Sequence, residues 1–310
     1  MIEFISPKEK PLVIPVFIPH MGCSNRCAFC DQKKITGTGS QIGEIEATVD
    51  NYLSFSKKRK VTELSFYGGS FTSLPFNEMM RYVEEGRKLV EKGKVDSLRC
   101  SARPDAINRD VVDILKKNGF KTIEIGVQTM SDKLLERMKR GHKSDVVFKS
   151  IYILKEKGLK TVVQLMTGYP YESCKDIEIT LESLEKLKPD YLRIYPFVPL
   201  KGTEIYDDIE NGSVNMTEVD TVIKRSAQLF ITAMLISAPV IRIGLPVSQN
   251  IPDIYPHNIS QIVVGKAIEM LAEKGETNFV VPNEYLTSFN MVRKKEKFTR
   301  IKKQKLLNKT

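Results

Sequence analysis

Six short hydrophobic runs mark the first two thirds of the chain. We interpret them as apolar throughout rather than alternating, and such strands are typical of a sheet whose two faces are both covered. Gly, Pro and polar clusters follow each run, as expected where strands end. The predicted strands cover residues 12–18, 62–67, 97–102, 122–127, 161–166 and 191–197.

Between these runs, hydrophobic residues recur three and four positions apart, which indicates amphipathic helices. Asn108 and Ser144 are candidate N-caps for two of them, and Gly119 and Gly158 are candidate stops. A third helix stops before Pro189. The clearest predicted helices cover residues 110–119, 145–158 and 174–187.

Strands that alternate with helices predict an α/β fold with a parallel sheet and right-handed crossovers. Six such units predict a partial (β/α)6 TIM-like barrel with a C-terminal extension. The extension holds a possible strand at 240–244, a helix at 260–275 and an apolar run at 278–281, and we expect it to cover the open side of the barrel. The predicted division is a core at residues 1–245, an accessory segment at 246–292 and a basic tail at 293–310.

The composition is that of a globular protein, with 41% hydrophobic and 28% charged residues in 310. No apolar run approaches the roughly 18 residues of a membrane span. The N-terminal stretch "MIEFISPKEKPLVIP" has acidic residues and a proline where a signal peptide needs an apolar segment. We therefore expect a cytoplasmic protein without membrane contact, in which clustered cysteines bind metal or do redox chemistry.

The positive charge is concentrated at the C-terminal end. Residues 293–310 hold nine Lys/Arg and one Glu, a net of +8, which leaves +2 of the total +10 for the other 292 residues. Basic tails of this kind often contact nucleic-acid phosphates, so RNA is a possible partner through this tail. The tail is equally well interpreted as a solvated chain end that contacts no nucleic acid.

In a barrel of this kind, function resides on the loops that follow the strands. The loop after the first predicted strand reads "PHMGCSNRCAFCDQ" and spaces Cys23, Cys27 and Cys30 as C-x3-C-x2-C. Structural zinc needs four ligands, and His20, Cys100 or Cys174 would have to supply the fourth. A [4Fe–4S] cluster held by three cysteines keeps one iron open to a small chelating molecule. The spacing favours the cluster and leaves zinc as the alternative.

The motif C-x3-C-x-aromatic-C, with Phe29 as the aromatic residue, resembles that of the radical S-adenosylmethionine (SAM) enzymes. The glycine pair in "FYGGSFTSLP" supports the resemblance. The motifs "YGGSFT", "GVQT", "RGH" and "LMTGYP" resemble the branch that contains oxygen-independent coproporphyrinogen oxidase and the Elongator catalytic subunit. The resemblance covers residues 12–245, and the ~65 residues that follow leave no room for the Elongator acetyltransferase domain.

The resemblance implies two cofactors, a [4Fe–4S] cluster held by the three cysteines and SAM chelated to its open iron. One electron, from a donor such as flavodoxin or ferredoxin, then cleaves SAM to methionine and a 5′-deoxyadenosyl radical that removes a hydrogen atom from the substrate. The protein orients the cofactor and excludes side reactions.

The resemblance also implies the residues that contact SAM. Gly68 and Gly69 would let the backbone approach the methionyl amine, and Arg140 would pair with the carboxylate. The remaining implied contacts are Phe29 near the adenine, Gln128, Ser70 and Arg103, with Ser101 and Gln164 at the ribose. Coproporphyrinogen oxidase has acidic residues at the last two positions, so their replacement argues against porphyrin chemistry.

Three functions follow from these patterns. The first is a radical SAM enzyme that acts on tRNA, as the basic tail and the Elongator-like motifs suggest. The second is a radical SAM enzyme for a porphyrin-like or small-metabolite substrate. The third is a non-catalytic, zinc-stabilised protein that binds nucleic acid.

Overall fold

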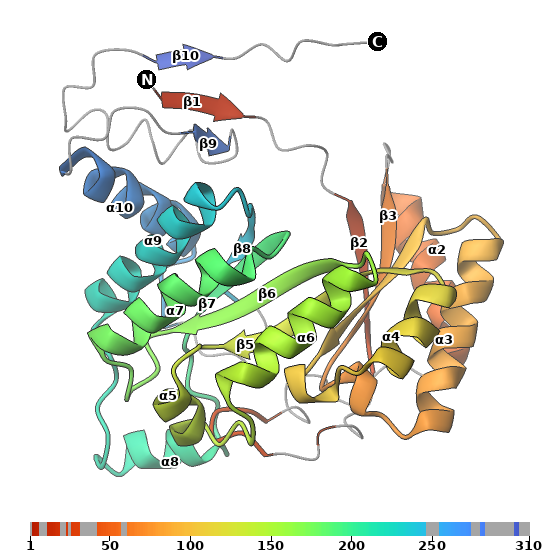
Figure 1. Ribbon diagram of the computed structural model, residues 1–310, viewed down its shortest axis with the longest axis horizontal. Helices are drawn as coiled ribbons and strands as arrows, with labels where there is room; N and C mark the ends of the chain where they lie inside the picture. Colours follow the sequence, from red (N-terminus) through yellow and green to blue (C-terminus); the bar gives the residue numbers. More distant parts are fainter. Residues whose placement is uncertain are drawn as a thin grey trace.

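A computed structural model describes residues 2–5, 11–18, 23, 26–31, 42–56, 61–245, 254–273, 280–282 and 301–303. Its centre is a curved sheet of seven parallel strands in the order of the sequence (Figure 1). The strands are β2 (Leu12–Phe17), β3 (Thr62–Tyr67), β4 (Ser97–Ala102), β5 (Phe120–Gln128), β6 (Lys160–Thr167), β7 (Tyr191–Pro196) and β8 (Val240–Ile243). The predicted α/β class and the partial TIM-like barrel are confirmed, and the possible strand predicted at 240–244 forms β8, the seventh strand of the sheet.

Helices connect the strands and cover the outside of the curved sheet (Figure 1). Three short 3₁₀ turns are η1 (Ile42–Glu44), η2 (Phe71–Ser73) and η3 (Pro104–Ala106). The first α-helices are α2 (Ile45–Phe55), α3 (Phe76–Glu91), α4 (Arg109–Lys117), α5 (Asp132–Arg137) and α6 (Ser144–Glu156). The others are α7 (Cys174–Leu187), α8 (Glu204–Glu210), α9 (Val219–Leu235) and α10 (Ile259–Glu273).

All three predicted helices form, and their ends explain why. The side chain of Asn108 accepts a hydrogen bond from the N–H of Val111, as an N-cap does. Ser173 and Asp176 form a reciprocal capping box at the start of α7. The prediction of Ser144 as a cap is wrong, because the cap position is Lys143. The N–H of Ser144 is satisfied by the Asp132 carboxylate from α5, a contact that spacing along the helix could not reveal.

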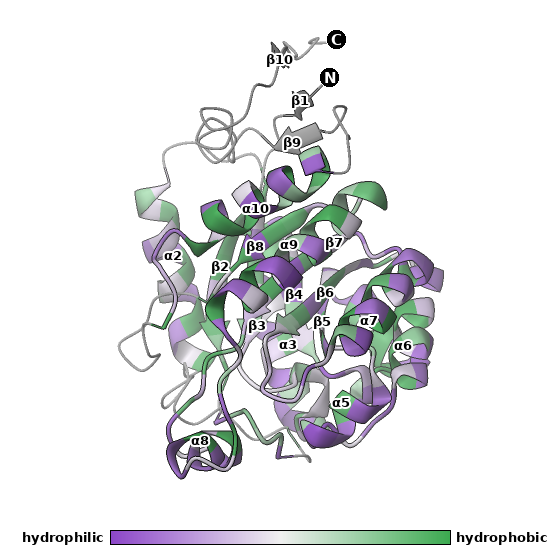
Figure 2. Ribbon diagram, turned by 90° about the vertical axis from the view of Figure 1, so that its left-hand side faces the viewer, coloured by the Kyte–Doolittle hydropathy of each residue, from purple (hydrophilic) through white to green (hydrophobic). Residues whose placement is uncertain are grey.

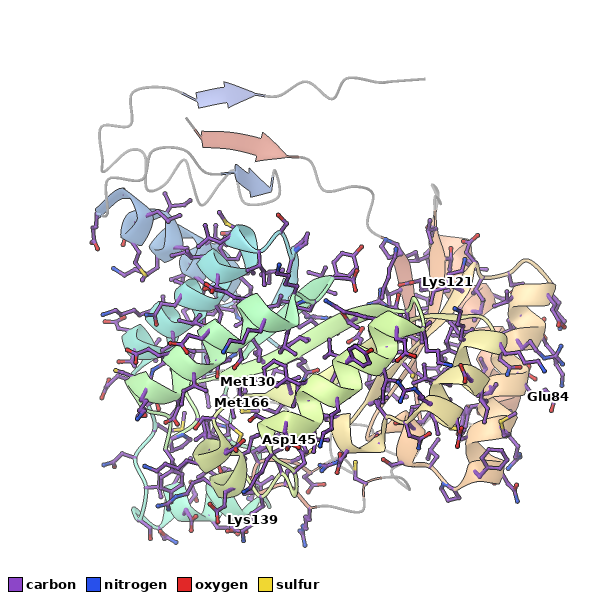
Figure 3. The ribbon with its side chains drawn as sticks, in the orientation of Figure 1. Glu84, Lys121, Met130, Lys139, Asp145 and Met166 are labelled. Carbon is purple, nitrogen blue, oxygen red and sulfur yellow. The ribbon has the colours of Figure 1, made fainter. Side chains whose placement is uncertain are left out.

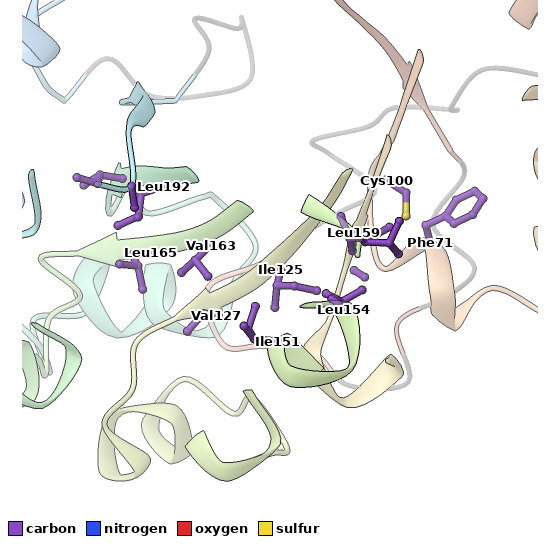
Figure 4. Packing of buried hydrophobic residues seen from close by; sticks show 14 of the residues in the cluster. Phe71, Cys100, Ile125, Val127, Ile151, Leu154, Leu159, Val163, Leu165 and Leu192 are labelled. Atoms are coloured by element: carbon purple, nitrogen blue, oxygen red, sulfur yellow. The ribbon is translucent and has the colours of Figure 1, made fainter. Parts of the chain in front are cut away.

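The prediction that the strands are apolar throughout is also wrong, because their two faces differ. The outer face packs under the helices in one hydrophobic cluster, as Ile125, Val163 and Leu165 show (Figure 4). The residues between them point inward and are polar or charged, among them Glu63, Ser65, Arg99, Glu124, Gln164 and Arg193. The sheet therefore encloses a polar space rather than a packed apolar barrel interior.

The outer surfaces of the helices carry the solvated side chains. Polar residues gather on the outward turns of α5 and α6 (Figure 2). Glu84 and Lys139 project outward, whereas Met130 and Met166 lie within the body (Figure 3). No helix in the described ranges is long and apolar enough to cross a membrane.

The C-terminal extension contributes α10, which packs against α9 and β8. Tyr255, which precedes it, donates a hydrogen bond of 2.8 Å from its hydroxyl to the carbonyl of Phe197 after β7. A separate parallel sheet pairs β1 (Ile2–Ile5) with β9 (Val280–Pro282) and β10 (Ile301–Lys303), so backbone from all three predicted segments meets there. The predicted division at residues 245 and 292 stays a prediction, and most of the basic tail lies outside the described residues.

We expect Leu165→Ala to reduce the free energy of unfolding by about 2–5 kcal/mol, because Leu165 is fully buried on the outer face of β6. Urea denaturation with an unchanged m-value measures the loss. Lys121→Ala, at an exposed position of β5, is the matched control and should change stability by less than about 0.5 kcal/mol. Equal losses in the two variants would contradict the assignment of the outer face.

Candidate active site

The loops at the C-terminal ends of the strands surround a cavity of about 800 Å³. Every residue predicted to hold a metal or a cofactor lines it, except Ser70. These are Cys23, Cys27, Phe29, Cys30, Gly68, Gly69, Ser101, Arg103, Gln128, Arg140 and Gln164. Residues spread over more than 140 positions of the chain therefore meet in one place.

The cysteine loop is fixed by backbone hydrogen bonds to two helices. The N–H of Ala28 donates to the carbonyl of Met138 at the end of α5, at 3.1 Å. The N–H of Ile205 in α8 donates to the carbonyl of Ala28, also at 3.1 Å. Between these anchors the N–H of Cys30 bonds to the carbonyl of Cys27 at 3.2 Å and tightens the turn. These bonds hold the described part of the loop against the two helices, and its three cysteines line the cavity.

Two arginine side chains converge on the sulfur of Cys27. Nη1 of Arg140 lies 3.3 Å from Sγ, and Nη1 of Arg103 lies 3.6 Å from it. Burial raises the pKa of the nearby Cys23 thiol, although the backbone N–H of Ser70 and the charge of Arg103 act to lower it. Two positive charges beside the cysteines suit ligands that must become thiolates.

The two arginines differ in whether a carboxylate neutralises their positive charge. Arg103 makes a bidentate ion pair with Asp105, at 2.9 and 2.8 Å, and also donates to the carbonyl of Arg140. Arg140 is only 5% exposed and pairs with no carboxylate in the described part of the chain. Its Nη2 donates to the carbonyl of Gly126, and its Nε is buried without a hydrogen-bond partner. A buried cation of this kind is prepared for an anionic ligand.

Gln128 occupies a strained position at the end of β5. Its φ is +69°, a region that residues other than glycine seldom adopt. The pairing of β5 with β6 shifts between Gly126 and Gln128, which marks a bulge there, and Gln128 lines the cavity. Its Oε1 is buried with no partner. An unpaired amide held in a strained conformation beside a cavity indicates a ligand contact.

The glycine pair follows β3 on the opposite wall. Gly68 has a φ of +102°, which a side chain would make unfavourable. The hydroxyl of Ser101 lies 3.4 and 3.3 Å from the carbonyls of Gly68 and Gly69 and links this turn to β4. Ser70 does not line the cavity. Its Oγ accepts a hydrogen bond from the N–H of Arg103, so it positions the loop instead.

Phe29 contributes its ring to packing, as well as to the cavity wall. The ring meets Tyr169 edge-on with 6.3 Å between centroids, and Tyr169 meets Phe197 in the same way at 5.3 Å. The loop that carries Tyr169 is held by Glu172, which accepts hydrogen bonds from the N–H of Gly168 and from Arg225 in α9. Packing thus connects the cysteine loop to the loop after β6.

A buried charge network, which sequence reasoning missed, borders the cavity, and three of its residues, Tyr67, Glu124 and Arg193, line it. Arg99 bonds to both Glu63 and Glu124, and Arg193 lies 3.1 Å from the same Glu124. The Tyr67 hydroxyl donates to Glu124 at 2.6 Å, and burial and that carboxylate raise the pKa of Tyr67. We call Glu63, Tyr67, Arg99, Glu124 and Arg193 the floor network. Its signal in the sequence was one charged residue inside each of four predicted strands, at 62–67, 97–102, 122–127 and 191–197.

The other cysteines do not approach the loop. Cys100 is fully buried in the hydrophobic cluster on the outer face, and Cys174 is exposed at the start of α7. His20, the other proposed zinc ligand, lies outside the described residues. Within the described ranges, no three His, Cys, Asp or Glu side chains are already arranged around a metal position. The structure therefore gives no support to zinc coordination that includes Cys100 or Cys174.

A model of the radical SAM superfamily matches residues 17–184, more than half of the chain. The chain belongs to the radical SAM superfamily. Over 135 residues it is 33% identical to the tRNA uridine(34) acetyltransferase of Methanocaldococcus jannaschii, a match that covers 42% of this chain and 25% of that protein. This radical SAM protein is therefore an enzyme, with relatives in the branch that its motifs predicted.

Solved structures show the same fold. Elp3 of Methanocaldococcus infernus superposes with a TM-score of 0.66 at 20% identity, over 85% of this chain and 63% of that one. Coproporphyrinogen III oxidase of Escherichia coli superposes with a TM-score of 0.54 at 20% identity, over 74% of this chain and 53% of that one. The radical SAM chain spans 64%, 53% and 25% of the lengths of three curated relatives that it matches.

The residues present fit the cofactors that the superfamily implies. Three thiols beside two guanidinium groups match an anionic iron–sulfur centre. The unpaired buried atoms, Nε of Arg140 and Oε1 of Gln128, provide a donor and an acceptor for a polar ligand such as the methionyl end of SAM. No protein atom in the described ranges satisfies either atom.

Glu172 provides a test of the loop geometry through pH. Burial raises its pKa to about 7, despite hydrogen bonds from Gly168 and Arg225. An acid with a raised pKa binds its proton more tightly when folded, so its contribution to stability is complete below about pH 4.5 and is lost as the pH rises through 7. Relative to Glu172→Gln, the wild type should lose on the order of 2–3 kcal/mol between pH 5 and 7.5.

Urea unfolding at several pH values measures this difference. Glu178→Gln, an exposed position in α7, is the control and should follow the wild-type pH dependence. If Glu172→Gln also follows it, Glu172 is not held as the structure shows.

Proposed function

We propose that this radical SAM enzyme holds a [4Fe–4S] cluster through Cys23, Cys27 and Cys30 and uses SAM to modify tRNA. The observation that carries the first part is the convergence of the three cysteines, the glycine turn and an unpaired Arg140 on one cavity. When bound to a reduced cluster, SAM supplies a 5′-deoxyadenosyl radical that removes a hydrogen atom from the substrate.

The protein's own residues bind and orient SAM in this proposal. Arg140 receives the carboxylate, because its charge is buried and has no acidic partner in the described ranges. The backbone at Gly68 and Gly69 faces the amine, and Gln128 accepts a hydrogen bond at its unpaired Oε1. Ser101 and Gln164 line the cavity where the ribose would lie. Phe29, fixed by Tyr169, borders the adenine and keeps water from the sulfonium.

Ser70 and Arg103 act in support. Ser70 holds the backbone of Arg103, and Arg103 holds the backbone of Arg140, so the two arginines keep a fixed separation. Asp105 neutralises Arg103, whereas Arg140 has no carboxylate partner among the described residues. An electron donor such as flavodoxin or ferredoxin would reduce the cluster, since radical SAM enzymes generally need a reductant.

Two features support tRNA as the substrate. The sequence is similar to a tRNA uridine(34) acetyltransferase over 135 residues, and the basic tail carries a net +8. A tail of that charge adds sequence-independent affinity for a phosphate backbone. We place this reaction in the cytoplasm.

The cysteine assignment predicts that Cys27→Ala abolishes the formation of 5′-deoxyadenosine from SAM and dithionite under anaerobic conditions. The loss should exceed about a hundredfold, because the cluster loses a ligand and the activating charge pattern around it. Iron and sulfide content and the product are measured together. Cys174→Ser, at an exposed cysteine away from the cavity, should retain wild-type activity and cluster content.

The substrate assignment predicts that tRNA from a strain without this protein lacks one modified nucleoside. Mass spectrometry of digested tRNA from the deletion strain and the wild type would identify it, and the purified enzyme with SAM should restore it. Identical nucleoside profiles would rule out tRNA and favour a small-metabolite substrate.

A further inference from the structure

The cavity has a second wall that the proposed SAM contacts leave unused. The cysteine loop follows β2 at one edge of the sheet, and Arg242 lies on β8 at the other edge. Strand pairing aligns Gly126, Gln164, Arg193 and Arg242 in one row across β5 to β8. All four residues line the cavity. This row ends in two arginines that are paired on neighbouring strands.

A bulge in β8 creates this neighbourhood. Leu192 pairs with Val240, but the next residue, Arg193, pairs with Arg242, so Ile241 is the additional residue. Bulges re-aim side chains. In a regular pairing Ile241 would stand opposite Arg193. The irregularity therefore replaces an apolar neighbour with a second cation at the cavity wall.

The charges of the cavity are not balanced at this end. Like charges opposite each other on adjacent strands are unfavourable unless something compensates them. Arg193 is compensated, because it shares Glu124 within the floor network, whose two carboxylates and two guanidinium groups cancel. Arg242 has no carboxylate partner among the described residues and is exposed to the cavity. One positive charge therefore remains.

Both side chains keep donors available. Arg193 donates from Nη1 to the Tyr195 hydroxyl at 3.1 Å and from Nη2 to Tyr67 at 3.0 Å, while its Nε is buried without a partner. Arg242 uses only Nε, which donates to the carbonyl of Gly244 at 3.2 Å. Its two terminal nitrogens have no partner in the described part of the chain. A guanidinium with both terminal nitrogens available can bind phosphate or carboxylate oxygens bidentately.

We propose that Arg242, backed by Arg193, binds an anionic group of the substrate, a phosphate or a carboxylate. This inference rests on the proposed function, since it places the substrate in the cavity that holds SAM. It also separates the two anions of the reaction. The SAM carboxylate belongs to Arg140 beside Cys27, and the substrate anion belongs to the β7–β8 wall. In the row, Gln164 lies between Arg193 and Gly126, whose carbonyl accepts from Arg140, and it offers a neutral amide to either ligand.

The test measures binding of radiolabelled pyrophosphate, used as the anion probe, by anaerobic equilibrium dialysis of the reconstituted full chain with SAM. The wild type should bind pyrophosphate at the Arg242 site on β8, and this binding should not depend on SAM. Arg242→Gln should weaken this binding about tenfold or more, as expected for the loss of a charge-assisted bidentate contact. Arg242→Lys should recover part of it, because the charge remains and the fork is lost.

Arg109→Gln is the matched control, because it removes an exposed arginine of α4 that pairs with Glu156 away from the cavity. It should bind pyrophosphate as the wild type does. Thermal unfolding of each variant checks that the fold is intact. Wild-type binding by Arg242→Gln would overturn the inference and assign the anion affinity to another surface, such as the basic tail.

Competition identifies the source of the anion. Displacement of the probe by tRNA indicates a nucleotide phosphate, and displacement by citrate but not by tRNA indicates a small carboxylate substrate. Iron, sulfide and SAM cleavage are measured on the same preparations. A wild type without a cluster contradicts the proposed function, whereas a wild type that cleaves SAM but shows no Arg242-dependent binding contradicts this inference alone.

Discussion

The sharing of buried charge within the floor network is the interaction on which the site depends. A charge moved from water into a protein costs several kcal/mol unless partners surround it. Arg99 donates hydrogen bonds to Glu63 and Glu124. Glu124 also accepts a hydrogen bond from Tyr67 and pairs with Arg193. The central groups of the network therefore each have two or more partners. This closed arrangement lets the inner face of the sheet stay polar. An apolar interior would instead have filled the space that the cofactor needs.

Much of the fold could be predicted from the sequence, because its signals are local. Helix periodicity and the cap at Asn108 depend on neighbouring residues, and so does the C-x3-C-x2-C spacing. The floor network could not be predicted in the same way. Arg99 and Arg193 are single charged residues in otherwise strand-like runs. The partners of Arg99 lie 25 and 36 positions away along the chain, and Glu124, the partner of Arg193, lies farther from it still. Only the folded sheet shows that these residues share one face.

The same distinction applies to the candidate site. The motifs identified eleven residues that line the cavity, since most of these residues lie at or just after the C-terminal end of a strand and parallel strands end at one edge. They did not identify Arg242, whose orientation depends on a bulge that no short pattern encodes. The motif predicted that Ser70 contacts SAM, but in the structure its Oγ accepts a hydrogen bond from the N–H of Arg103 and positions the loop. Motifs thus locate the loops, whereas backbone irregularities decide which side chains face the ligand.

The unpaired atoms of the cavity indicate why the free protein is organised as it is. A buried polar atom without a partner costs about 1–3 kcal/mol, and Arg140, Gln128 and Arg193 each contain one. A fold that needed only stability would pair or replace these groups. A ligand that satisfies them recovers that free energy on binding, because the positions are already fixed by Cys27, by the β5 bulge and by Glu124. The free energy that the unpaired atoms cost in the free protein therefore adds to the binding affinity of the ligands, and the fixed positions of these atoms orient the bound molecules.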